Sequence, residues 1–161
     1  MNKTMRTLRS LAAAAAVCVA CAGSAEAGSK DGLGVGVILG EPTGLSVKKW
    51  TDDTHAIDAA LAFSLTDGNP FQFHADYLIH DNNALAVPEL KGTLPWYYGI
   101  GGRVKADNGE TRVGARFPLG VSYMFADAPL DIFAEVAPIV DIAPYVSLRF
   151  NGALGLRYYF K

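Results

Sequence analysis

Three histidines, His55, His74 and His80, are the side chains in this sequence best suited to proton transfer near neutral pH. His74 stands two residues before Asp76, so on an extended strand both side chains project from one face. An imidazole beside a carboxylate is the base-and-orienter half of a catalytic triad, which still requires a nucleophile. The alternative is a histidine held in a polar interior or loop. We favour that interpretation and expect no catalytic residues.

Other chemistry finds little support in the sequence. Both cysteines, Cys18 and Cys21, lie near the N-terminus, and no two histidines stand at helical or hairpin spacing on one face. The glycines of 99–102 fall in the middle of a predicted strand with no helix after them, which argues against a nucleotide site. The formal net charge is −2, so no broad basic surface is available for nucleic acid. We expect no metal, no cofactor and no nucleic-acid partner.

A set of charged residues forms the main candidate site. Its members fall on the same faces of their predicted strands, and an ionised group in a narrow interior is costly unless it is paired. The set could form a charged constriction in a channel, or a sealed network that fixes the register of the strands. We favour the sealed network because an eight-stranded barrel is only wide enough for its own side chains. The residues are Asp58, Asp76, Arg103, Arg112, Arg116, Glu135 and Arg157.

Strands must position these residues, because no segment of about ten or more residues holds a helical period. Turn residues such as Asp67-Gly68-Asn69-Pro70 and Asp107-Asn108-Gly109 separate β-type segments, several of them about ten residues long, enough for a tilted strand to cross a membrane. The predicted strands are 33–39, 44–50, 55–65, 70–80, 95–105, 111–124, 130–140 and 150–160.

Alternation along these strands separates an apolar face from a face rich in Gly, Ala and Ser with isolated charges. In 70–80, Phe71, Phe73 and Tyr77 oppose His74 and Asp76. A soluble lipocalin-like barrel or sandwich would carry more Lys, Glu and Thr on its polar face. Small residues suit a narrow interior, and aromatic residues gather near strand ends as in interfacial girdles. We therefore predict an all-β, eight-stranded antiparallel up-and-down transmembrane barrel over 28–161.

The first 27 residues differ from the rest. A basic start precedes an uncharged Ala-rich stretch, and Ala25-Glu26-Ala27 offers the small-x-small pattern before Gly28 that signal peptidase accepts. We predict a cleaved signal peptide over 1–27 and export through the periplasm. A rival interpretation makes Cys21 a lipidation site.

Three motifs and the C-terminal segment carry a family resemblance. The segments are Gly34-Val35-Gly36, 40–46, 133–138 and the final strand with Leu156, Tyr158 and Phe160. The chain resembles small bacterial outer-membrane β-barrel proteins of unknown function, similar to the eight-stranded OmpA/OmpX-like barrels. The resemblance implies an outer-membrane location, lipid partners, and an assembly signal read by the barrel assembly machinery. It implies no activity.

We expect a monomeric barrel with a structural, envelope-integrity or surface-interaction role. A narrow channel is the first alternative and a lipid-modifying enzyme the second. Lipid A deacylases carry a serine two positions after the histidine, where this chain has Asp76 after His74 and Asn82 after His80. Surface interaction would use short outer loops at 67–69 and 141–144. One feature fits poorly, because 81–94 would be an unusually long periplasmic turn.

Overall fold

The computed structural model describes residues 32–63, 71–82, 91–107 and 109–160, in which the regular elements are all β-strands. No helix in these ranges is long and apolar enough to cross a membrane. The strands are β1 Leu33–Gly40, β2 Gly44–Trp50, β3 His55–Phe63, β4 Phe71–Asp81, β5 Trp96–Asp107, β6 Glu110–Arg116, β7 Leu119–Met124, β8 Leu130–Ala143 and β9 Ser147–Phe160.

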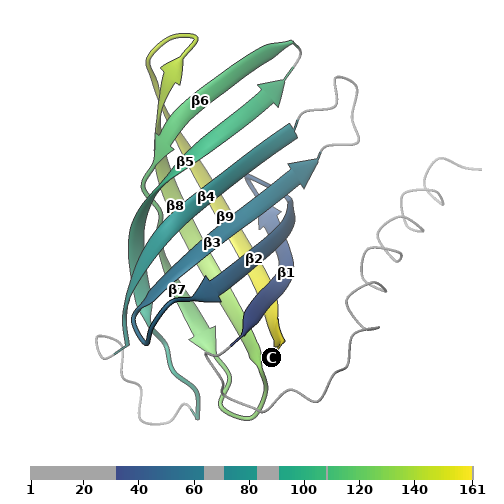
Figure 1. Ribbon diagram of the computed structural model, residues 1–161, viewed down its shortest axis with the longest axis vertical. Coiled ribbons are helices and arrows are strands. Elements are labelled where there is room, and N and C mark those ends of the chain that lie inside the picture. Colours follow the sequence, from purple (N-terminus) through teal and green to yellow (C-terminus); the bar gives the residue numbers. More distant parts are fainter. Residues whose placement is uncertain (1–31, 64–70, 83–90, 108, 161) are drawn as a thin grey trace, which may run out of the picture.

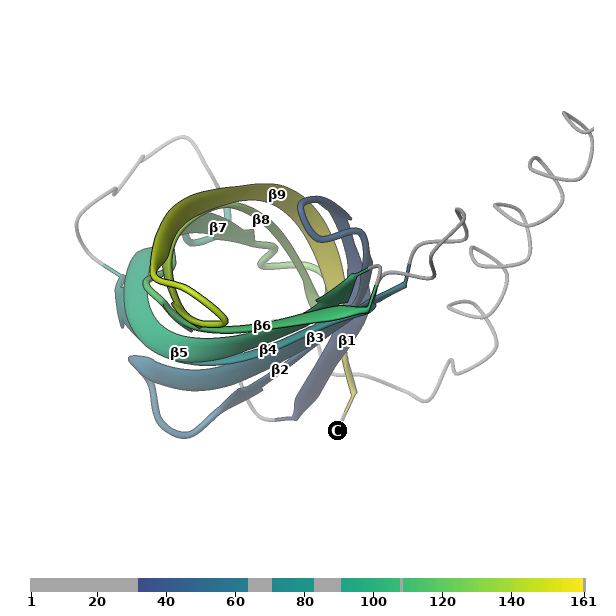
Figure 2. The same ribbon diagram turned by 90° about the horizontal axis from the view of Figure 1, so that it is seen from above.

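The strands form one antiparallel sheet that closes on itself (Figures 1 and 2). Consecutive strands pair along the chain, except that β6 and β7 both lie between β5 and β8. The ring closes where β1 pairs β9 from Leu33↔Phe160 to Gly40↔Ala153. Closure removes free sheet edges, so every strand in the wall has a partner on both sides. The prediction of a closed antiparallel barrel is confirmed.

β6 and β7 are two halves of one wall position, which the sequence predicted as a single strand over 111–124. Arg116 pairs Ile139 and Leu119 pairs Val136, so both halves keep one register against β8. The interruption falls at Phe117-Pro118, because Pro118 has no N–H to donate to the ladder. The ring therefore has eight strand positions, although nine segments are assigned.

The two ends of the barrel differ. Leu33 and Phe160 lie together at one end, and the connections β2–β3, β4–β5 and β7–β8 return the chain there. The opposite end, here called the distal mouth, carries the β1–β2, β5–β6 and β8–β9 turns (Figure 1). The long connection predicted over 81–94 does separate β4 from β5; residues 83–90 of it lie outside the described ranges.

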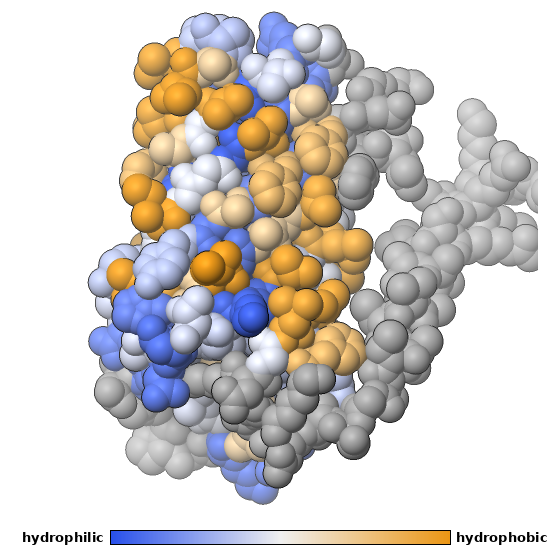
Figure 3. Space-filling view, viewed as in Figure 1, coloured by the Kyte–Doolittle hydropathy of each residue, from blue (hydrophilic) through white to orange (hydrophobic). Residues whose placement is uncertain are grey.

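The two faces of the wall match the predicted alternation. Large apolar side chains point outward and are exposed, among them Ile100 and Leu154, and Figure 3 shows such side chains over the flank of the barrel. The inner face is crowded: a Cβ added at Gly36 or Gly101 would overlap the backbone of the neighbouring strand. Glycine is therefore required at these inward positions, whereas Gly102, facing outward, has no neighbour within 4 Å of such a Cβ.

Strand bounds agree with the sequence to within about three residues, but the distal ends of β8 and β9 reach further than predicted. The prediction assigned 141–144 to an outer loop. That is wrong for Asp141, which lies in β8 with 1% of its surface exposed. The other predicted loop, 67–69, lies outside the described residues.

Candidate functional site

Arg116 is the centre of a charge cluster inside the barrel. Its side chain is 1% exposed and its guanidinium donates to Asp76 on β4 and to Glu135 on β8. The hydroxyl of Tyr97 donates to the other oxygen of Glu135 at 2.9 Å. One cation thus links two carboxylates from opposite parts of the wall. Such pairing is what makes buried charge tolerable.

Arg157 on β9 forms a second cluster. Its Nη2 donates to Asp58 at 2.9 Å, its Nε donates to Ser46 at 2.9 Å, and its Nη1 lies 3.7 Å from Asp131. The guanidinium also lies over the ring of Phe133, 3.8 Å from the centroid. The Arg157 head group therefore contacts two carboxylates, a hydroxyl and an aromatic ring in the interior.

Lys48 on β2 lies in an aromatic setting toward the end of the barrel that holds Leu33 and Phe160. Its Nζ is 2.9 Å from Nε2 of His80 and 4.4 Å from the centroid of Trp50. Tyr97 contributes a second ring at 5.5 Å. Aromatic faces attract a desolvated cation, so Lys48 is stabilised without a directly bonded carboxylate. This explains the position of His80, which the sequence left as a polar interior or loop residue.

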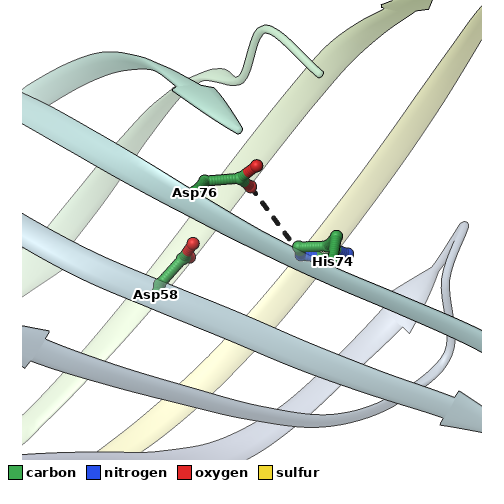
Figure 4. A group of neighbouring side chains, drawn as sticks. All are labelled: Asp58, His74 and Asp76. Carbon is green, nitrogen blue, oxygen red and sulfur yellow. Dashed lines mark ion pairs between the residues drawn. The ribbon is translucent and has the colours of Figure 1, made fainter. Parts of the chain in front are cut away.

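His74 and Asp76 share the inner face of β4, as their spacing predicted, and Asp58 joins them from β3 (Figure 4). His74 Nε2 lies 3.9 Å from Asp76 Oδ2, and one potential ligand atom from each of the three residues lies within 4.8 Å of the others. Two carboxylates and an imidazole could hold a divalent cation. However, guanidinium groups of Arg116 and Arg157 already contact the two carboxylates. We therefore assign the trio to ion pairing.

The distal part of the interior holds Arg103, which donates to Asp141 at 2.6 Å with both side chains buried. Arg149 shares this carboxylate at 3.5 Å. Arg112 was predicted to belong to the same interior network. The structure places it on the inner face of β6 but at the distal mouth, where its side chain is 19% exposed and pairs with Glu110 two residues away at 3.2 Å. β6 begins at this mouth, where water reaches its first residues.

The structure therefore brings six of the seven predicted charges into the buried interior and leaves Arg112 at its edge. Sequence reasoning missed three members: Lys48, Asp131 and Asp141. Lys48 could have been found by extending the alternation through 44–50, where it shares a face with Ser46. Asp131 and Asp141 lie near strand ends, where charges usually mark loops.

His55 has a different setting from the other two histidines. It lies beside the β2–β3 turn, partly exposed, with Nδ1 2.9 Å from Oδ1 of Asp52. The N–H of Thr54 and then the His55 side chain donate to Asp52, and these bonds hold the pKa of its carboxyl well below the usual range. This pair stabilises a turn and lies outside the interior clusters.

Other predicted sites fall at the chain ends. The cleavage residues Ala25, Ala27 and Gly28, and the lipidation candidate Cys21, lie outside the described residues. The final-strand residues Leu156, Tyr158 and Phe160 alternate along β9, with the rings of Tyr158 and Phe160 4.8 Å apart. Their role as an assembly signal stays a prediction.

The fold defines the class of molecule: an eight-stranded antiparallel β-barrel. Among solved structures, it is similar to the N-terminal β-barrel domain of Pseudomonas aeruginosa OprF. The TM-score is 0.54 at 11% identity, over 80% of this chain and 95% of that domain. At such identity the likeness concerns the fold. No protein-family model and no curated protein matches the chain.

Proposed function

We propose that this chain is an outer-membrane β-barrel with a structural role in the envelope and no catalytic activity. One observation carries the proposal: charged side chains pair with one another inside the ring, while apolar side chains cover its outside. In water this arrangement would be inverted, because exposed apolar surface is costly and ion pairs gain little from burial. In a bilayer it is favourable, since the apolar band meets hydrocarbon.

The packing of the interior supports a sealed barrel over a channel. Arg116, Arg157, Tyr97, Lys48 and Phe133 are among the largest fully buried side chains and fill the space that a solute would need. Ion paths require charges that face water and bind weakly enough to release. The buried charges in this barrel form ion pairs with one another instead.

A lipid-modifying enzyme is disfavoured by the position of the histidine. His74 is 2% exposed and faces inward, away from the wall that would meet lipid. A general base must come within hydrogen-bond reach of its substrate, and the packed side chains around His74 leave it almost no exposed surface.

Cell fractionation combined with gel electrophoresis of unheated and heated samples tests the location and the fold together. We expect the protein in the outer-membrane fraction and a shift in gel mobility on heating. Recovery in the soluble periplasm would refute the proposal. Planar-bilayer recordings test the sealed interior: we expect no discrete conductance steps, and steps that change in Arg116→Ala would favour the channel instead.

A further inference from the structure

A cavity of about 320 Å³ opens at the distal mouth, apart from the Arg116 and Arg157 clusters. Its polar lining combines four cationic side chains with a single carboxylate and an amide. Three strands of one side of the wall, β5, β6 and β9, contribute the cations. The polar lining residues are Arg103, Lys105, Arg112, Arg149, Glu41 and Asn151.

The register places like charges next to each other. Lys105 on β5 is the direct cross-strand partner of Arg112 on β6, and both belong to the inner face. Like charges directly opposite one another destabilise a sheet. Arg103 on β5 and Arg149 on β9 share the carboxylate of Asp141, and Arg112 pairs with Glu110. The four cations that line the cavity therefore exceed by one the carboxylates that line it or pair with them, and an anion would offset this excess positive charge.

Three hydrogen-bond donors at this cavity also lack acceptors. Within the described residues, Arg103 Nε, Arg112 Nε and Asn151 Nδ2 are buried atoms without a hydrogen-bond partner. Arg103 is 3% exposed and Asn151 is 4% exposed. Buried donors without acceptors cost free energy, and all three belong to residues that line this cavity. A ligand with several acceptor oxygens would satisfy them together.

From the excess positive charge of the cavity and its unpartnered hydrogen-bond donors, we propose that the distal mouth is a binding site for a phosphate group. The phosphate is either inorganic phosphate or part of a phosphate monoester. Guanidinium groups match phosphate oxygens in pairs, and Lys105 supplies a point charge beside them. The inference goes beyond the proposed structural role and does not depend on it, because the site lies at the end of the barrel and needs no path through it.

Titration calorimetry of the full chain, folded in detergent micelles at constant ionic strength, tests the site with inorganic phosphate as the probe. We expect saturable binding that Lys105→Gln and Arg112→Gln each weaken by about tenfold or more, since a charge-assisted hydrogen bond is lost. Lys91→Gln is the matched control, because Lys91 lies toward the other end of the barrel. The heat-dependent gel shift verifies that each variant is folded. Absence of saturable binding, or equal affinity in Lys105→Gln and the wild type, would overturn the proposal.

The phosphate could come from solution or from the head groups of lipopolysaccharide. The same titration in vesicles containing lipid A, with or without its phosphates, separates the two sources. If only phosphorylated lipid abolishes binding of inorganic phosphate, the head group occupies the site. If binding is the same in both vesicles, the ligand is a soluble phosphate.

Discussion

Arg116 offers the sharpest test of a dry, sealed interior. Replacing it by methionine keeps much of the side-chain length but removes the partner of two buried carboxylates, Asp76 and Glu135. Removing one member of a buried ion pair costs about 3–5 kcal/mol, because the remaining charge is left without compensation. Because this one substitution leaves two carboxylates unpaired, we expect Arg116→Met to lower the free energy of unfolding by an amount in the upper part of that range.

Arg112→Met is the matched control. Arg112 is also an inward-facing arginine with an acidic partner, Glu110, but that pair lies at the mouth in contact with water. Exposed pairs contribute roughly 0.2–1 kcal/mol. The two variants therefore remove the same chemical group from settings that differ in hydration, so the difference between their costs reports on burial.

Urea unfolding of the barrel in phospholipid vesicles, followed by tryptophan fluorescence, measures both costs; the chain has two tryptophans. Adding Glu135→Gln to Arg116→Met should recover about 1–3 kcal/mol, because it removes one of the unpaired charges. Equal costs for Arg116→Met and Arg112→Met would refute the reasoning. That result would mean that water reaches the middle of the barrel, as a channel requires.

Three further predictions use the same unfolding measurement. Gly101→Ala should lower the free energy of unfolding by about 1–3 kcal/mol, because the added Cβ would overlap Asp76. Gly102→Ala should leave that free energy almost unchanged, because Gly102 faces outward. Equal effects of the two substitutions would contradict a packed interior. Ile100→Arg should lower the free energy of unfolding in vesicles by about 2–4 kcal/mol, since Ile100 is exposed on the outer face near the middle of β5. An unchanged free energy of unfolding would show that this face does not meet hydrocarbon. Because the folded pKa of Asp52 lies below its unfolded value, its stabilisation is complete above the unfolded pKa and is lost as the pH falls. The stability gap between the wild type and Asp52→Ala should therefore shrink from about pH 5 to about pH 2, and a constant gap would disprove this role.

The sequence predicts the faces of the wall well, because a strand alternates sides at every residue and the inner positions are visibly small or charged. It does not predict that the strand over 111–124 is interrupted, although the sequence contains Pro118 within it. A proline inside an alternating run can lie at a short interruption without changing register, and only the pairing with β8 shows that Arg116 and Leu119 share one register.

Partner choice inside the barrel could not be predicted. Arg157 pairs with Asp58, 99 residues away, and Arg116 with Asp76, 40 residues away. Which charges meet depends on the register of several strands at once, and local patterns carry no information on it. Arg157 reaches Asp58 through the β1–β9 closure, whereas Gly101 lies in register between Asp76 and Arg116. The same reason explains why Asp141 was assigned to a loop: its partner Arg103 lies two strands away, with Gly114 in register between them.

The two ends of this network differ in how its charges are satisfied. In the middle, Arg116 and Arg157 each contact two carboxylates, so removing either arginine leaves buried carboxylates unpaired. At the distal mouth, four cations line a cavity, and Asp141 and Glu110 pair with three of them, so an added anion would find both space and unpaired positive charge. A barrel that is sealed by its own side chains can recognise a ligand only at its ends or on its outer wall. The cavity at the distal mouth is therefore the part of the described interior where binding and stability are separable by mutation.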